Sequence, residues 1–327
     1  MTMLMLRTAC LLFFAAVNAA AQTDLDWRPT KPVEIVAGST AGGALDRTAR
    51  DIQAALQRQK LVDVPIIVSN KPGAGSSIAW AYVSKQRADA NALTVIIPGL
   101  LTNKEMGIGS LTYKDLAPIA ILSSEFVVFG VNATSELKSG RELVRLLRAD
   151  PARLNIGIAT ALGGASHLSV AQTMKAAGVD VQRLHFIVYS SSAEAVTALL
   201  GNHLDLVAAS AGNFLPVLNS GRVRTLAITS PQRVPGVFAE IPTWTEQNVN
   251  AVFSAWRGLA GPPGMTPAQL RFWDDTIRRM VQSKDWAELL ARTHEQSSYM
   301  NSSDAAAFLD AQHRDLGRTI VELGLAK

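Results

Sequence analysis

The chain has 327 residues, a formal net charge of +4 and 18% charged residues. It contains no dense Lys/Arg run with interleaved aromatic residues, which argues against nucleic acid as a partner. The length suits two domains of ordinary size, each of which can bury its own hydrophobic core.

The first 21 residues have the layout of a secretory signal peptide. Arg7 precedes an apolar run from Thr8 to Val17, and three small residues end the segment at Ala21. The run is shorter than the roughly 20 residues that a membrane span needs, and no comparable run follows. We therefore expect cleavage near Ala21 and export of a soluble chain of 306 residues (327 minus 21). Cys10, the only cysteine, lies in this segment without a lipobox, so the mature chain is expected to fold without disulfides.

From Lys31 onward, apolar β-rich runs alternate with helical patterns, which is typical of an α/β protein with mostly parallel sheets. The stretches 121–131 and 228–256 are candidates for crossings between two lobes. This organisation predicts a first lobe of residues 22–124 plus 240–327 and a second lobe of residues 125–239. The predicted strands are 33–37, 64–69, 93–97, 155–159, 184–188, 204–208 and 225–229. The predicted helices cover about 45–56, 77–87, 167–177 and 193–200, and the part from about Pro263 onward is mainly helical.

Four strand-to-helix junctions are rich in Gly, Ser, Thr and Ala, at 38–43, 70–77, 160–166 and 189–192. In an open parallel sheet, ligands bind beyond the carboxyl ends of the strands, where these junctions lie. A helix start presents unpaired backbone N–H groups and partial positive charge, and glycine lets a backbone approach a ligand closely. The pattern predicts a carboxylate site built from amides and hydroxyls, without a dedicated arginine. The alternative is that these residues simply cap helices, as they do in any α/β protein.

Five side chains near these junctions each allow two interpretations. Asp46 either orders the first loop or interacts with the helix dipole, and we favour the dipole. Asp205 lies in an otherwise apolar strand, where an unpaired carboxylate is costly to bury, so we favour a position in the cleft. Tyr189 ends a strand and either walls the cleft or packs in the core. Ser166 and His167 suggest a nucleophile and a base, but adjacent helical residues point in different directions, so we favour capping and packing.

Signatures of enzymes and metal sites are missing from the sequence. No Walker loop and no Gly-x-Ser-x-Gly elbow occurs in it. The remaining histidines show no metal-ligand spacing. We therefore expect no enzyme activity, no cofactor and no metal.

Several blocks of sequence together resemble the Bug proteins, which are the substrate-binding components of tripartite tricarboxylate transporters. The most specific block is Asn70-Lys71-Pro72-Gly73-Ala74-Gly75. The resemblance spans nearly the whole mature chain and continues through Lys31 to Val36, Ala41-Gly42-Gly43 with Asp46 and Arg50, Gly163 to Leu168, Gly221 to Ala227 and Trp256 to Leu259.

The resemblance implies a two-lobed periplasmic-binding-protein fold of type 2, in which the lobes close like a Venus flytrap about a hinge of crossing strands. Such a protein captures a small carboxylate in the cleft between its lobes and delivers it to two membrane subunits of a transporter. A periplasmic location and a monomer are expected. Two alternatives stay open, namely a ligand-presenting subunit that signals to a membrane kinase and a hydrolase that uses Ser166 and His167.

The resemblance also implies which residues face the ligand. Three departures from the family pattern bear on the ligand more than on the fold. Gly38-Ser39-Thr40 replaces a Pro-Phe-Pro-like stretch, Ser191 replaces a usual Gly, and residues 88–94 replace a Pro-Asp-Gly-Tyr-Thr-Leu-like turn. In the first lobe the ligand-facing residues are Ser39, Thr40, Ala41, Gly42, Gly43, Ala74, Gly75, Ser76 and Ser77. In the second lobe they are Thr160, Ala161, Gly164, Ser166, His167, Tyr189, Ser190 and Asp205.

Overall fold

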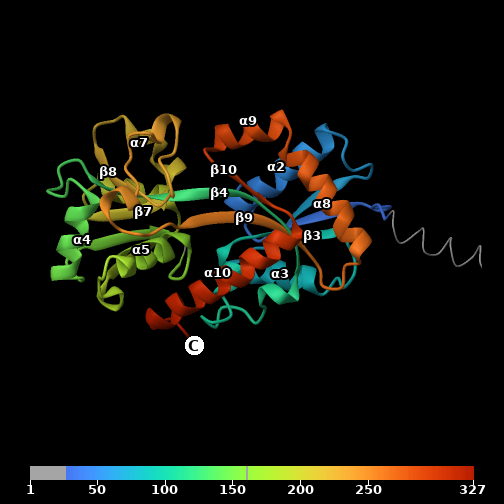
Figure 1. Cartoon of the computed structure of the whole chain (residues 1–327), viewed down its shortest axis with the longest axis horizontal. Coiled ribbons are helices and arrows are strands. Elements are labelled where there is room, and N and C mark those ends of the chain that lie inside the picture. Colours follow the sequence, from blue (N-terminus) through green and yellow to red (C-terminus); the bar gives the residue numbers. More distant parts are fainter. Residues whose placement is uncertain (1–26, 160) are drawn as a thin grey trace, which may run out of the picture.

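One sheet runs through the molecule, and the long strand β4 (Ala117–Asn132) joins its two parts. The computed structural model describes residues 27–159 and 161–327, so the predicted leader and Thr160 lie outside the described residues. The strand order is β2-β1-β3-β9-β4-β7-β5-β6, and β8 and β10 pair with β4 as well. Figure 1 shows β4 and β9 along the long axis of the molecule, with one group of elements at each end.

The first group of elements surrounds the strands β1, β2 and β3. β1 pairs in parallel with β2 and β3, and β9 pairs antiparallel with both β3 and β4. Leu45, Ala49, Ile52 and Leu56 of helix α2 are all buried, as their helical spacing predicts. The elements are β1 (Val33–Ala37), α2 (Ala44–Arg58), β2 (Ile66–Asn70), α3 (Ser77–Ser84), β3 (Ala92–Ile96), β9 (Ser254–Gly261), α8 (Pro267–Val281), α9 (Lys284–Thr293), β10 (Gln296–Met300) and α10 (Ser302–Glu322).

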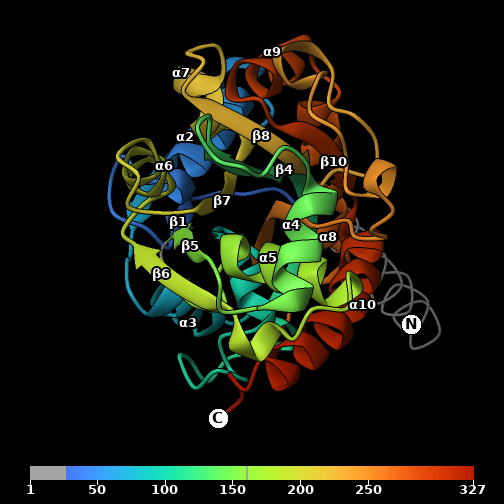
Figure 2. The ribbon, with the colours of Figure 1, turned by 90° about the vertical axis from the view of Figure 1, so that its left-hand side faces the viewer.

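The second group of elements surrounds the strands β5, β6 and β7. β5 pairs in parallel with β6 and β7, whereas β7 and β8 pair antiparallel with β4. Figure 2 looks onto this end of the molecule and shows α4 and α5 in front of the sheet. The elements are α4 (Gly140–Ala149), β5 (Asn155–Ala159), α5 (Ala165–Ala176), β6 (His185–Tyr189), α6 (Ser192–Leu200), β7 (Leu206–Ser210), α7 (Leu215–Leu218) and β8 (Val223–Ile228).

The two groups share the strand β4. Its first part pairs with β9 and β10, and its second part pairs with β7 and β8. The sheet is therefore parallel among the outer strands of each group and antiparallel at the crossing strands. Helix α10 also touches both groups, because Thr319 accepts a hydrogen bond from Gln172 of α5 (3.5 Å) and Glu322 forms an ion pair with Lys175.

The segment between β8 and β9 packs against the second group. The backbone N–H of Trp244 donates to the Ile228 carbonyl (3.2 Å), and the Trp244 ring lies edge-on to Phe129 of β4. The Gly140 N–H donates to Gln247 Oε1 (2.7 Å) at the start of α4. The expected boundary at 239/240 assigns residues 240–253 to the first lobe, whereas Trp244 and Gln247 of this segment contact the second group. We propose that the boundary lies at the start of β9 instead.

Most predicted elements differ from the observed ones by a few residues at their ends. The strands 33–37 and 155–159 coincide with β1 and β5. β10 is absent from the prediction because its sequence, Gln-Ser-Ser-Tyr-Met, lacks an apolar run, and four of its five residues are only half-buried. α10 has 21 residues, yet neither it nor any other helix within residues 27–159 and 161–327 is apolar enough to cross a membrane.

Candidate ligand-binding site

The first predicted loop, between β1 and α2, is ordered by a buried carboxylate. Asp46 is 2% exposed, and its Oδ2 accepts hydrogen bonds from the Gly42 N–H (2.8 Å) and from Arg50 Nε (3.0 Å). Asn70, at the end of β2, donates to Asp46 Oδ1 (2.9 Å) and to the Ser39 carbonyl (3.0 Å). Asp46 therefore orders the loop, and the preference for a mere dipole interaction is wrong.

The same contacts set the protonation of Asp46. The hydrogen bond from Arg50 is the largest influence, and those from Gly42 and Asn70 act in the same direction. Against the opposing effect of burial, they lower the pKa of Asp46 to about 2. The carboxylate stays ionised at neutral pH, and its charge is paired with Arg50.

The second predicted loop has an unusual backbone. Four consecutive residues have positive φ, namely Gly73 (120°), Ala74 (47°), Gly75 (56°) and Ser76 (79°). For the two non-glycine residues this left-handed conformation costs on the order of 1–3 kcal/mol each. Such strain persists only where surrounding contacts hold it in place.

Asn103 supplies those contacts. Its side chain is buried, and Nδ2 lies 3.0 Å from the Gly75 carbonyl, 3.3 Å from the Ala74 carbonyl and 3.0 Å from Ser77 Oγ. Ser76 Oγ donates to the Gly38 carbonyl (3.2 Å), which joins the second loop to the first. A Cβ added at Gly38 would lie 2.4 Å from Ser76 Cβ, so only glycine allows the two loops to approach this closely.

The third predicted loop, between β5 and α5, is folded back onto its own helix. Ser166 Oγ accepts from the Ala159 N–H (3.1 Å), and His167 Nδ1 accepts from the Gly163 N–H (2.9 Å). Burial lowers the pKa of His167 to about 4, so the ring is neutral at neutral pH. Each side chain thus stabilises the loop backbone, and the described residues contain no hydrogen bond between the two. The geometry agrees with the capping interpretation.

The fourth predicted junction, between β6 and α6, is closed by its own side chains. Ser191 Oγ accepts from the Glu194 N–H (3.2 Å), and Ser190 donates to the Glu194 carboxylate through its N–H (3.1 Å) and its Oγ (2.5 Å). Tyr189 is half-buried and packs against the hydrophobic cluster of the second group. These contacts fit a capping role for Ser190 and a packing role for Tyr189.

Asp205 lies away from the other predicted residues. It is exposed and precedes β7, and its Oδ2 accepts from the N–H of Asn155 (2.8 Å). Asn155 begins β5, whereas the third loop follows the other end of β5. The structure therefore places Asp205 at the opposite edge of the sheet from the third loop, where a hydrogen bond from a neighbouring strand satisfies the carboxylate.

Three of the four junctions share a feature at the helix start. Helices α2, α3 and α5 begin without a hydrogen bond to an N-cap side chain, since their N-cap residues are Gly43, Ser76 and Gly164, and Ser76 Oγ is turned to Gly38. Every other described helix of at least nine residues has such a cap. The capping residues are Ser139 of α4, Ser191 of α6, Thr266 of α8, Ser283 of α9 and Asn301 of α10.

A segment that sequence reasoning missed connects these helix starts. Asn103 holds the second loop, and Met106, three residues later, is buried in a cluster that also contains Leu168 of α5. A Cβ added at Gly163 would lie 2.1 Å from Met106 Sδ, so the side chain rests directly on the third loop. The segment follows β3, which pairs in parallel with β1. The segment therefore lies at the same edge of the sheet as the loop that follows β1.

No group of three or more His, Cys, Asp or Glu side chains in the described part of the chain is arranged to hold a metal ion. The side-chain amides of Asn70 and Asn103 already donate to protein oxygens, so the groups that the candidate site offers are the backbone amides and hydroxyls of its loops. Such groups donate hydrogen bonds to oxygen atoms, and uncapped helix starts add partial positive charge.

The fold and this edge of loops define a two-lobed periplasmic binding protein. A TctC solute-binding protein from Polaromonas superposes with a TM-score of 0.77 and 26% identity, over 90% of this chain and 99% of that one. The chain belongs to the tripartite tricarboxylate transporter family of receptors, whose family model (TctC) matches residues 48–325.

One further relative agrees with this assignment, and one further solved structure shares the fold. The chain is 29% identical to Protein BugT of Bordetella pertussis over 290 residues, which cover 86% of this chain and 85% of BugT. The structure of R. palustris Rpa4515 with adipate has a TM-score of 0.76 at 24% identity, covering 92% of this chain and 99% of that one, and shows a common fold. The resemblance to Bug proteins is confirmed.

Proposed function

We propose that this chain is a periplasmic receptor that binds a small carboxylate between its two groups of elements and delivers it to membrane subunits of a transporter. The observation that carries the proposal is that α3 and α5, one helix from each group, begin without a side-chain cap, whereas at the start of α2 the Asp46 N–H donates to Ser39 Oγ (3.1 Å). The contacts of Asn103 and Met106 bring these starts together from both groups. Membership of the receptor family supports the same role.

A carboxylate fits these helix starts for an electrostatic reason. The first N–H groups of a helix have no intrahelical acceptor, and the aligned peptide dipoles amount to roughly half a positive charge there. Asp46 does not cancel this effect, because its charge is paired with Arg50 and its oxygens are bonded to Gly42 and Asn70. The adipate in Rpa4515 supports a dicarboxylate as a first candidate ligand.

Ligand closure, export and partners belong to the proposal as well. The two groups close about β4 and β9 when the ligand binds. The leader up to Ala21 directs the chain to the periplasm. The receptor is a monomer that delivers its ligand to two membrane subunits and has no enzyme activity. A hydrolase receives no support from the geometry, because Ser166 and His167 bond to the loop backbone. A sensor partner would use the same ligand site, and recovery of a kinase rather than transporter subunits on purification from membranes would favour it.

Thermal denaturation of the purified mature chain tests the ligand class. We expect adipate or another small mono-, di- or tricarboxylate to raise the free energy of unfolding by about 2.7 kcal/mol at a hundredfold excess over its Kd. The diamide of the same acid is the matched control and should give no stabilisation, because it lacks the charge. A carboxylate panel without any stabilising member, or equal stabilisation by acid and diamide, would overturn the proposal.

A further inference from the structure

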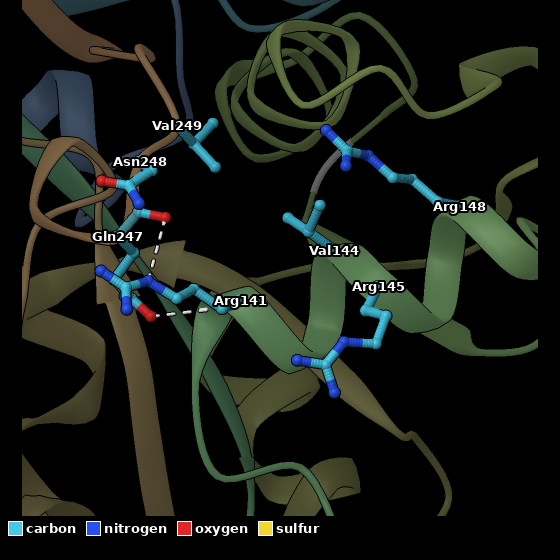
Figure 3. A pocket seen from close by; sticks show the side chains of 7 residues that line it. All are labelled: Arg141, Val144, Arg145, Arg148, Gln247, Asn248 and Val249. Carbon is cyan, nitrogen blue, oxygen red and sulfur yellow. Dashed lines mark hydrogen bonds between the residues drawn. The ribbon is translucent and has the colours of Figure 1, made fainter.

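A recess of about 300 Å³ lies between helix α4 and the loop 247–249, far from the predicted ligand loops. Figure 3 shows that the side chains of Arg141, Arg145 and Arg148 surround it. Val144 and Val249, both buried, form the apolar part of its wall. The recess therefore combines a cationic rim with an apolar wall.

The charges of the three arginines are not compensated. Within residues 27–159 and 161–327, none of the three has a carboxylate oxygen within 4.0 Å. Arg141 donates to the carbonyls of Glu246 (3.1 Å) and Gln247 (3.4 Å), while the Glu246 carboxylate pairs with Arg233 instead. Arg148 Nε donates to the Ala177 carbonyl (2.6 Å). These carbonyls orient two of the guanidinium groups and leave their charge intact.

The helix itself explains only one of these charges, because Arg148 lies in the last turn of α4, where a cation interacts favourably with the helix dipole. Arg141 and Arg145 are four residues apart and Arg145 and Arg148 three apart, and like charges at these spacings destabilise a helix. Helix α4 already has its own cap, since Ser139 Oγ accepts from the Glu142 N–H (3.3 Å). The three charges are therefore best explained by an anionic partner.

The position of the recess keeps it clear of the ligand loops. α4 lies at the outer end of the second group in Figure 1 and in front in Figure 2. It precedes the amino end of β5, whereas the third loop follows the carboxyl end. The lining residues lie on α4 and on the loop 247–249, and Gln247 of this loop bonds to α4, so an occupant neither covers the ligand site nor has to bridge the two groups.

We infer that this recess docks an acidic, outward-facing loop of a membrane subunit, and the inference rests on the proposed delivery function. Membrane proteins concentrate Lys and Arg in their cytoplasmic loops, so their outward-facing loops are poor in basic residues. Acidic residues there remain unbalanced and match a cluster of arginines. Guanidinium groups suit this role because they are weakly hydrated and bind carboxylates with two parallel hydrogen bonds.

A protein loop fits the recess better than a lipid surface does. A bilayer attracts flat clusters of several cations, whereas this site is concave and has only three. The buried Val144 and Val249 offer contact to an apolar side chain beside the acidic one. Charge complementarity of this kind speeds association and excludes wrong partners.

Photo-crosslinking in the producing bacterium tests the inference with the full chain. A photoreactive residue replaces Ala149, which is exposed, four residues beyond Arg145, and leaves all three arginines in place. The matched control position is Ala306, an exposed alanine of α10. We expect an adduct only from position 149, with a protein of several membrane spans, attached within an outward-facing loop that contains Asp or Glu.

Charge reversal sharpens the same experiment. The double substitution R141E/R148E should lower the adduct yield about tenfold, since like charges across an interface are strongly unfavourable, whereas R141K/R148K should retain most of it. The inference is overturned if position 149 gives no adduct, if positions 149 and 306 give equal adducts, or if the adduct forms with a soluble protein. An adduct yield that does not change on charge reversal also overturns it. In a separate measurement, arginine-dependent binding of the purified chain to phosphatidylglycerol vesicles would overturn it in favour of a lipid surface.

The docking inference and the ligand proposal fail in distinguishable ways. Purified R141E/R148E should keep the stabilisation by carboxylates, because the recess is remote from the loops. Loss of the adduct with retained stabilisation therefore locates the defect at docking. Absence of stabilisation in the unaltered chain contradicts carboxylate binding, whatever the crosslinking shows.

Discussion

Two helix starts lie side by side at the carboxyl ends of β5 and β6, and they are built differently. Ala159 pairs with Tyr189 at the ends of these strands. α5 then begins at Gly164 without a side-chain cap, whereas α6 begins at Ser191, whose Oγ accepts from the Glu194 N–H. Both junctions have the same small polar composition. The difference teaches that this composition marks a helix start but does not identify a ligand site. A helix start can bind a ligand only where no side chain of the protein accepts from its first N–H groups.

The largest expected effect concerns His167 at the α5 start. The unfolded chain protonates this residue near pH 6.5, while in the folded chain the pKa is about 4. Its neutral form therefore contributes stability that is complete above pH 6.5 and is lost as the pH falls toward 4, up to about 3 kcal/mol. Urea denaturation across this range should show the loss in the unaltered chain and a smaller slope in His167→Asn, which keeps an acceptor for Gly163. Equal slopes would contradict the burial of a neutral ring.

A second prediction extends the comparison to the α3 start. Asn103→Ala removes the donor that holds the carbonyls of Ala74 and Gly75, so the strained loop should relax. We expect a loss of about 2 kcal/mol in the free energy of unfolding, together with weaker carboxylate binding measured by calorimetry. Asn70→Ala is the matched control at the first loop. Unchanged affinity in Asn103→Ala would show that the second loop does not touch the ligand.

The contact between Met106 and the α5 start is tested by a double-mutant cycle. Gly163→Ala places a Cβ against Met106 Sδ at a φ of +76°, so it combines a steric clash with backbone strain. Met106→Ala should relieve the clash and leave the strain. We expect a coupling free energy of about 1.5 kcal/mol between the two substitutions, from chemical denaturation. Additive effects would mean that the two groups do not meet at this point.

The smallest effect is expected at the α6 start. Ser191→Ala removes a cap and should cost about 1 kcal/mol of stability, while the Kd for a carboxylate stays the same. Calorimetric titration of the variant checks this directly. A large change in affinity would place the ligand at the fourth junction and erase the distinction between the two helix starts.

The sequence predicts the loops better than the roles of single residues. β1 and β5 are apolar runs bounded by small residues, so local chemistry defines them, whereas β10 is polar and depends on its partner β4. Asp205 and Asn155 are fifty residues apart, and their hydrogen bond leaves no local trace. Asn103 was missed for the same reason, since its acceptors precede it by 26 to 29 residues.

The structure changes the result that is expected when Gly75 is replaced by a bulky residue. The sequence suggests that this change blocks ligand approach and leaves the fold intact. In the structure Gly75 has a φ of +56°, and an added Cβ would lie 2.9 Å from Asn103 Nδ2. The substitution would therefore also disturb the loop, which makes it a poor probe of ligand contact alone.

The continuity of β4 has a thermodynamic consequence. The sixteen residues of β4 form hydrogen bonds to strands of both groups, so unfolding of either group removes part of the other group's sheet. The two halves should lose their structure together, as one endotherm in scanning calorimetry rather than two. A ligand bound at the carboxyl ends of the strands would then raise the melting temperature of the entire molecule.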